Sequence, residues 1–303
     1  MRRILLTLVC VVATLSRIDF CIANDDPSDL EKLKELGADV TETDGTVTGI
    51  SVNDCSRFGD AEYRLIGRFH DQKKLSLGQC KGLTDKTLSN LTELTNLENF
   101  VTNGMQVTDK GLAQMSRLSN LRVIGFFHPS IGMRGFDGRG FAALKELPKL
   151  ESLSIGGSPF NDKGMAAVSE ITQLKHFRIW HTYQTQAGNQ YLTKLTELKT
   201  LLLGQRMPRA GRPNPLSLDD STFDVLVQLK TLESLELNEA KLSLASLRRL
   251  SELPKLKNLN LPQIDIPAED IETLKTELPS VKIDWKPLTE AERTKLTAYL
   301  KKF

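Results

Sequence analysis

The side chains best suited to chemistry gather in the middle of this 303-residue chain. They combine large aromatic rings with imidazole and guanidinium groups, a mixture typical of the centres of protein interfaces and of sites that stack on sugars. Three of the four histidines and one of the two tryptophans belong to this group: Phe127, His128, His176, Arg178, Trp180 and His181. We therefore expect recognition of a partner here rather than catalysis.

A second group is the arginine-rich segment GQRMPRAGRPNP at 204–215. Its cations Arg206, Arg209 and Arg212 have no acidic residue nearer in sequence than Glu197 and Asp219. In solenoids, insertions usually form loops on one face, often the binding face. The segment therefore adds a basic loop to the predicted binding region.

The sequence lacks the motifs that mark common catalytic sites. It contains no G-x-S-x-G, H-E-x-x-H, P-loop or dinucleotide-binding fingerprint. A glycine-rich string at 132–140 lacks the lysine and serine of a phosphate-binding loop. We expect no enzyme activity and no cofactor.

A repeat of about 24 residues organises the chain that carries these groups. Leucine accounts for 49 residues, and LENFVTNGMQVTDKGLAQMSRLSN at 97–120 matches LESLSIGGSPFNDKGMAAVSEITQ at 150–173 position by position. Self-similarity at this period indicates a solenoid of stacked units. The units begin near residues 47, 72, 97, 121, 150, 174, 198, 232, 256 and 281.

Each unit predicts one strand followed by one short helix. It opens with L-x-x-L-x-L, whose alternation is that of a strand with one buried face. A pair such as Thr108-Asp109 then offers side-chain acceptors to the free N–H groups of a new helix. Leu112, Met115 and Leu118 follow at intervals of three and give that helix one inward stripe. Because one unit cannot bury its apolar side alone, stacking must complete the core.

This pattern resembles the leucine-rich-repeat family over nearly all of the chain beyond its N-terminal segment. The TDKGL element at 108–112 and its variant TDKTL at 84–88 are similar to the subtype common in secreted bacterial members, as is LKELGADVTETDGTVTGISV at 33–52. The resemblance implies an α/β fold, a right-handed, arc-shaped solenoid with a concave parallel sheet and convex helices. It also implies binding to other macromolecules as the usual activity.

Within this frame the third, fifth, seventh and eighth residues of a unit face the concave side or its rim. The pairs Phe127-His128 and Trp180-His181 then flank Gly156-Gly157, with the rings of Phe127 and Trp180 roughly 10 Å apart. The two units of unusual length, the fourth and the seventh, border the same region, and insertions often lie on a binding face. We predict a groove over units four to seven that binds a protein, or alternatively a glycan.

Two other interpretations stay open. In the first, the proline-rich insertion folds over Phe127 and Trp180 and makes a private hydrophobic cluster that has no ligand. In the second, the chain is a structural or envelope-associated repeat protein without a specific partner.

The spacing of the histidines disfavours a metal ion, and the charges near the groove favour a protein partner over a uniformly anionic polymer. His128 and His181 lie two units apart, too far to share a zinc ion whose nitrogen ligands lie at about 2.0–2.1 Å, so no metal is expected. Glu233, Glu236 and Glu239 place an acidic surface beside the basic one. A surface with both signs favours a partner bound in one orientation.

The first 23 residues predict a secretory signal peptide, with an uncleaved anchor as the alternative. Arg2 and Arg3 precede an apolar stretch from Ile4 to Leu15, and Ala23 offers a small residue at the cut. Without this segment the chain has 37 basic and 37 acidic residues and no apolar run near the roughly 18 that a membrane span needs. We expect an exported chain that neither binds nucleic acid nor spans a membrane.

Both ends of the solenoid are expected to be covered. A helix over 27–36, started by Asp26 or Ser28 and ended by Gly37, belongs to an N-terminal cap and entry at 24–46. Nine repeats fill 47–280, and a capping strand and helix fill 281–303, where Thr289 and Glu292 form a capping box. The chain is thus expected to be one elongated domain, and its oligomeric state is left open.

Cys55 and Cys80 occupy equivalent positions in the first two units. Neighbouring strands place such positions about 5 Å apart, which is within the range of a disulfide. A buried pair of free thiols fits the same positions. Neither arrangement is catalytic.

Overall fold

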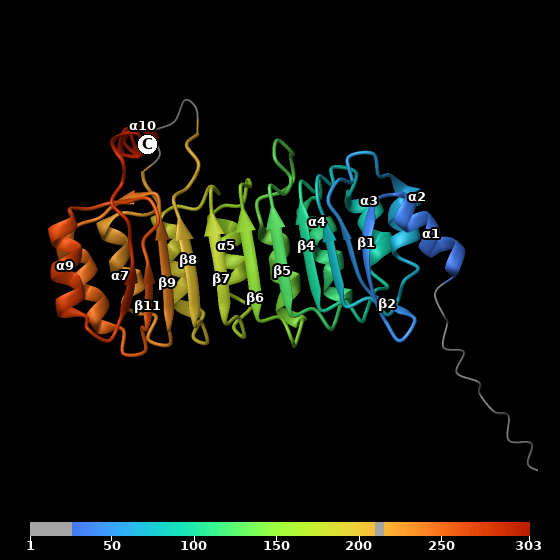
Figure 1. The fold of residues 1–303 in the computed structure, drawn as a ribbon, viewed down its shortest axis with the longest axis horizontal. Coiled ribbons are helices and arrows are strands. Elements are labelled where there is room, and N and C mark those ends of the chain that lie inside the picture. The colour runs from blue at the N-terminus through green and yellow to red at the C-terminus, as the bar shows by residue number, and fades with distance from the viewer. Residues whose placement is uncertain (1–25, 210–214) are drawn as a thin grey trace, which may run out of the picture.

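The computed structural model describes residues 26–209 and 215–303, so the predicted signal peptide and Arg212 lie outside the described residues. The described chain forms a solenoid in which strands and helices alternate (Figure 1). Its main sheet has eleven strands in the order β1-β2-β3-β4-β5-β6-β7-β8-β9-β11-β13. Every neighbouring pair is parallel except β1 and β2. The predicted α/β leucine-rich-repeat architecture is confirmed.

The strands begin in the predicted frame, a few residues after the start of each unit. Alternate side chains in them are buried, as the period of a strand with one covered face requires. A separate two-stranded parallel sheet, β10 with β12, joins the turns of the eighth and ninth units. The strands are β1 (Ala38–Thr43), β2 (Thr46–Val52), β3 (Lys74–Leu77), β4 (Asn99–Asn103), β5 (Val123–Phe127), β6 (Ser152–Gly156), β7 (His176–Trp180), β8 (Thr200–Gly204), β9 (Ser234–Asn238), β10 (Ala240–Lys241), β11 (Asn258–Asn260), β12 (Ile264–Asp265) and β13 (Lys282–Asp284).

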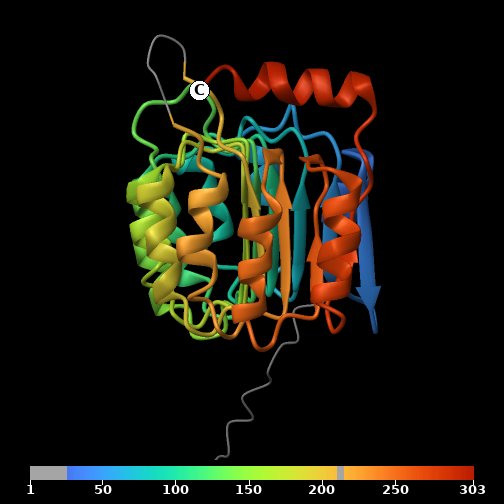
Figure 2. The ribbon, with the colours of Figure 1, turned by 90° about the vertical axis from the view of Figure 1, so that its left-hand side faces the viewer.

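The sheet lines the concave side of the arc and the helices cover the convex side. In Figure 2, which looks along the solenoid, the helices form the outer layer and the two ends of the sheet curve towards the same side. All strands of the parallel part point the same way, so their carboxyl ends share one rim (Figure 1).

The helices are shorter and tighter than the sequence predicted. A single α turn usually continues as a 3₁₀ helix, as in α4 (Asp109–Ala113) and η2 (Gln114–Arg117). Leu112, Met115 and Leu118, all fully buried, are spaced by three residues, which matches the 3₁₀ period better than the α period of 3.6. The α helices are α1 (Pro27–Glu35), α2 (Asp60–Ile66), α3 (Asp85–Leu88), α4, α5 (Asp162–Val168), α6 (Gln186–Asn189), α7 (Phe223–Leu226), α8 (Leu244–Arg248), α9 (Ala268–Glu277) and α10 (Glu290–Leu300). The other 3₁₀ helices are η1 (Ser89–Leu91), η3 (Arg139–Glu146), η4 (Gln190–Lys194), η5 (Asp220–Thr222) and η6 (Arg249–Glu252).

The threonine–aspartate pairs connect one unit to the next. Thr108 caps its own helix as predicted, but Asp85 accepts hydrogen bonds from the backbone N and hydroxyl of Thr108 in the following unit, at 2.7 and 2.6 Å. Asp162 does the same for Thr185. A side chain at Gly111 would place its Cβ 1.9 Å from the Asp85 carboxylate. The glycine of the TDKGL element is therefore needed to admit the carboxylate of the preceding unit.

One hydrophobic core runs the length of the solenoid. Besides the stacked leucines it contains Phe100, Phe126, Phe141 and Phe160, all fully buried. Neighbouring rings in this series lie 5.7–6.1 Å apart between centroids, mostly edge to face. Such contacts stabilise aromatic pairs beyond the area that they bury.

The N-terminal cap contains an element that the sequence analysis missed. Helix α1 begins after Asp26, whose side chain accepts from the backbone of Ser28, and Gly37 follows it with φ +81°. Strand β1 then pairs antiparallel with β2 through a turn at Asp44-Gly45, where both residues have positive φ. An Asp-Gly pair between alternating sequences is a recognised hairpin signal, so the sequence contained the information.

Cys55 and Cys80 are free and fully buried, which agrees with the buried pair of free thiols and not with the disulfide. Burial raises the pKa of each thiol to about 12.

The described residues include no helix with the length and apolar character needed to cross a membrane.

Candidate functional site

Strand β7 presents three of the predicted site residues on its concave face. His176 and Arg178 are exposed and Trp180 is half-buried, whereas Phe177 and Ile179 between them are fully buried in the core. Because successive side chains of a strand point to opposite faces, the three residues share the concave side. Phe127 ends β5 on the same face and is also half-buried.

Glycines on both neighbouring strands position the Trp180 ring. Gly156 is its register partner on β6, and a Cβ at that position would lie 2.5 Å from the ring. A Cβ at Gly204, at the end of β8, would lie 2.5 Å from the Cβ of Trp180. The ring lies over Gly156 towards Phe127, with ring centroids 5.8 Å apart and planes at 47°. The two rings therefore meet over Gly156 instead of standing roughly 10 Å apart.

Arg178 stacks beside this aromatic pair. The carbon of its guanidinium lies 5.9 Å from the centre of the Trp180 ring, a cation–π contact. We call Phe127, His176, Arg178 and Trp180 the concave patch.

The predicted site residues His128 and His181 have a left-handed backbone conformation. This conformation lies just after the strand and separates them from the concave patch. In seven of the nine repeats the eighth residue has positive φ, including His128 at +50° and His181 at +47°. Non-glycine residues rarely adopt this conformation, which here lies where the chain leaves each strand. His128 is exposed, and its Nδ1 is 3.1 Å from Oδ1 of Asn103 in the preceding unit.

His181 belongs to a second cluster. The sequence analysis named its members His181, Arg206 and Glu239 but not Tyr299. Its Nε2 lies 2.6 Å from the Glu239 carboxylate, two units further along the solenoid. The ring of Tyr299, from α10, lies 6.2 Å from the His181 ring. The Tyr299 hydroxyl donates a hydrogen bond of 2.6 Å to the backbone carbonyl of Arg206. We call His181, Arg206, Glu239 and Tyr299 the rim cluster.

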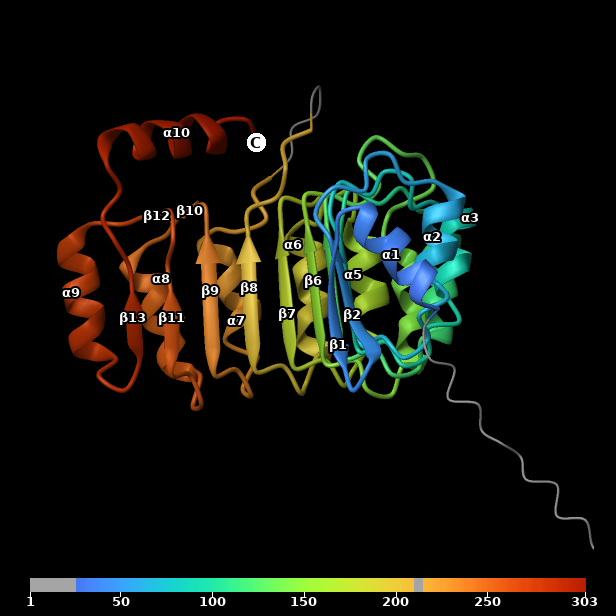
Figure 3. The same ribbon diagram turned by 45° about the vertical axis from the view of Figure 1, so that its right-hand side comes forward.

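Helix α10 reaches this cluster by folding back over the rim. Figure 3 shows it beyond the carboxyl ends of the last strands, and Figure 2 shows it crossing the top of the solenoid. The predicted capping box of Thr289 and Glu292 starts the helix, and Leu296 is its one buried residue. Burial and the nearby charge of Glu239 raise the pKa of Tyr299, which keeps its hydroxyl protonated as a donor.

The two described arginines of the insertion, Arg206 and Arg209, do not share one exposed surface as predicted. Arg206 is only 2% exposed, and burial lowers the pKa of its guanidinium, so it does not project into the groove. Gln205 fixes the base of the insertion, because its side-chain oxygen accepts from the backbone N–H groups of Arg206 and Ser217. Arg209 is exposed and lies over the Tyr183 ring at 4.4 Å. These described residues of the insertion contact the rim, and Phe127 and Trp180 keep part of their surface open.

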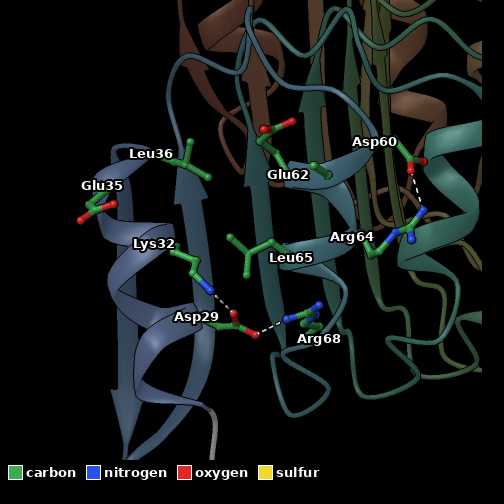
Figure 4. A pocket seen from close by; sticks show the side chains of 10 residues that line it. Asp29, Lys32, Glu35, Leu36, Asp60, Glu62, Arg64, Leu65 and Arg68 are labelled. Atoms are coloured by element: carbon green, nitrogen blue, oxygen red, sulfur yellow. Dashed lines mark hydrogen bonds and ion pairs between the residues drawn. The ribbon is translucent and has the colours of Figure 1, made fainter.

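A cavity of about 880 Å³ lies between α1 and α2 (Figure 4). Three of its charged side chains pair with one another, because Asp29 accepts from Arg68 at 2.6 Å and from Lys32 at 3.2 Å. The hydrogen bond from Arg68 lowers the pKa of Asp29. These contacts join the N-terminal cap to the first repeat, and we assign the cavity no ligand.

The comparisons with known proteins concern the fold alone. No family model and no curated protein matches the chain. Similar solved structures include an internalin from Listeria monocytogenes, with a TM-score of 0.46 and 16% identity over 79% of this chain and 72% of that one. Internalin C2 of the same species gives 0.38 and 18% over 66% and 83%, and a chain of the Rad7 and Elc1 complex of yeast gives 0.41 and 17% over 80% and 79%.

Proposed function

We propose that this protein binds a partner protein through the concave face of repeats four to seven, centred on the concave patch. The observation that supports this most is the pair of half-exposed rings, Phe127 and Trp180, with the exposed Arg178 beside them. Aromatic and arginine side chains on a rigid surface are the types that dominate interface energies. The parallel sheet beneath them fixes their positions before a partner arrives, which reduces the entropy lost on binding.

The glycines beside Trp180 explain why the aromatic pair is only half-buried. Gly156 and Gly204 leave room for Trp180 to lie along the sheet, and part of the surface of Trp180 and of Phe127 remains in contact with solvent. A ring pair needed only for stability would gain more from complete burial, as in Phe126 and Phe141 on the core side. We therefore favour binding over the private hydrophobic cluster.

The test is affinity capture from the native compartment with the double variant Phe127→Ala/Trp180→Ala. Val101→Ala is the matched control, because Val101 is also half-buried on this face of the sheet but lies on β4 in repeat three, outside the proposed site. Wild type and control should retain the same partner, and the double variant should lose it by about tenfold or more. The proposal is wrong if the double variant keeps every partner and only its melting temperature falls.

We also propose that the protein acts after export, as its N-terminal segment suggests. Arg2, Arg3 and the apolar run that follows have the order of a secretory signal. Sequencing the N-terminus of the protein purified from its native source should show a start near residue 24. A mature chain that begins at Met1 and stays in the cytoplasm would contradict export but not binding.

A further inference from the structure

The guanidinium of Arg178 faces solvent without an internal carboxylate. Its register neighbours on β6 and β8 are Ser154 and Leu202, which carry no charge. Within residues 26–209 and 215–303 its one recorded interaction is the stack on Trp180. The N–H donors of the guanidinium therefore have no hydrogen-bond acceptor within the described residues, and a group of another molecule can bind them.

The carboxylates around the concave patch are already engaged. Glu151 accepts from Arg122 at 2.7 Å and from Lys175 at 3.2 Å, and the hydrogen bond from Arg122 lowers its pKa. Glu239 is held by His181, and Glu236 accepts from Asn260 at 3.1 Å. Within the described residues none of these carboxylates forms an ion pair with Arg178: Glu151 pairs with Arg122 and Lys175, Glu239 contacts His181, and Glu236 accepts from the uncharged amide of Asn260.

The aromatic pair is shaped for a bulky apolar side chain rather than for a flat sugar ring. Gly156 lies under part of the Trp180 ring, Arg178 lies 5.9 Å from its centre, and Phe127 leans against it at 47°. Stacking on a sugar needs an unobstructed ring face, and these three neighbours crowd it. An apolar side chain can instead pack against the exposed parts of both half-buried rings, as in a protein hot spot.

We propose that the concave patch recognises an acidic peptide segment of the partner, in which a carboxylate pairs with Arg178 and an adjacent large apolar side chain packs on Phe127 and Trp180. The carboxylate can accept two parallel hydrogen bonds from the guanidinium, which makes arginine more selective here than lysine. Exposed His176, two residues before Arg178 on the same face, adds a further donor. This inference rests on the proposed function and specifies the chemistry of its partner.

The test uses fluorine NMR on the full chain labelled with fluorotryptophan. The described chain has two tryptophans, Trp180 in the patch and Trp285 in the C-terminal cap, where it donates to the carbonyl of Ile264. Trp285 is therefore an internal control for non-specific effects. The probes are acetylated pentapeptides of alternating glutamate and leucine, the same peptide with glutamine for glutamate, and the same with lysine.

We expect the glutamate peptide to shift the Trp180 resonance and leave that of Trp285 in place. Its dissociation constant should be about tenfold lower than that of the glutamine peptide, and the lysine peptide should bind more weakly still. Arg178→Gln should remove the preference for glutamate without unfolding the chain, whereas Arg178→Lys should restore part of it.

The outcomes separate this inference from the function on which it rests. If glutamate and glutamine peptides bind equally, or if no peptide moves Trp180 while the captured partner does, the acidic-peptide inference is wrong and the binding function stands. If neither the peptides nor any captured partner moves Trp180, both are wrong.

Discussion

Trp180 and His181 are adjacent in sequence but belong to regions with opposite character. In the concave patch Trp180 lies on the sheet beside an exposed guanidinium that has no internal carboxylate. In the rim cluster His181 is held by Glu239, and Tyr299 of α10 lies beside its ring and donates a hydrogen bond to the backbone of Arg206. The comparison teaches that residue types suited to binding mark a site only where their polar groups are left without a partner inside the molecule.

The backbone causes this division. The left-handed φ of His181 ends the strand geometry that aligns His176, Arg178 and Trp180, so the next side chain leaves the concave face for the rim. Helix α10 then fills the space at the rim with a residue from the far end of the chain. We expect substitutions in the rim cluster to change stability and substitutions in the concave patch to change binding.

The largest effect is expected for Tyr299→Ala in the rim cluster. The variant loses a hydrogen bond to a buried carbonyl and the ring contacts with His181 and Phe303, at a cost of about 2–3 kcal/mol. Amide hydrogen exchange in α10 should therefore accelerate by about 30- to 150-fold. Thr297→Ala, at an exposed position of the same helix, should leave exchange unchanged. Equal exchange in the two variants would show that Tyr299 does not hold α10.

A smaller loss of stability is expected for Gly156→Ala in the concave patch. The new Cβ would lie 2.5 Å from the Trp180 ring, so the ring must move, at a cost of about 1–2 kcal/mol. Urea unfolding followed by tryptophan fluorescence measures this, and the emission of the native protein should change as well. Gly125→Ala is the matched control, because its Cβ would find only ordinary contacts at 3.4–3.5 Å on the same face. Unchanged emission in Gly156→Ala would mean that the ring does not lie over this glycine.

The smallest effect on stability is expected for Arg178→Gln. Its side chain is exposed, and the one recorded contact is a cation–π stack worth about 0.5–1 kcal/mol at such sites. The free energy of unfolding should therefore fall by less than about 1 kcal/mol, while capture of the partner falls. A large loss of stability with unchanged capture would show that Arg178 contributes to the stability of the fold and not to binding.

The sequence predicted the repeat frame because apolar spacing follows directly from burial on one face of each strand. It also placed Phe127 and Trp180 on either side of Gly156, but it did not predict that the Trp180 ring would lie over this glycine and contact Phe127. It could not predict that Tyr299 contacts His181, because nothing local encodes where a terminal helix docks. The burial of Arg206 was missed for the same reason, since Tyr299 and Pro215 reach it only in the folded chain.

The measurement that tests the account most directly is site-specific photo-crosslinking with benzoylphenylalanine at position 127 or at position 299, in the native compartment. At position 127 the probe should form an adduct with another protein, and excess unlabelled wild-type chain should compete for it while the Phe127→Ala/Trp180→Ala chain should not. At position 299 the probe should react within its own chain, since Tyr299 lies against His181 and the Arg206 backbone. Adducts confined to the same chain at position 127, or capture of the same partner at position 299, would contradict the division between the two regions.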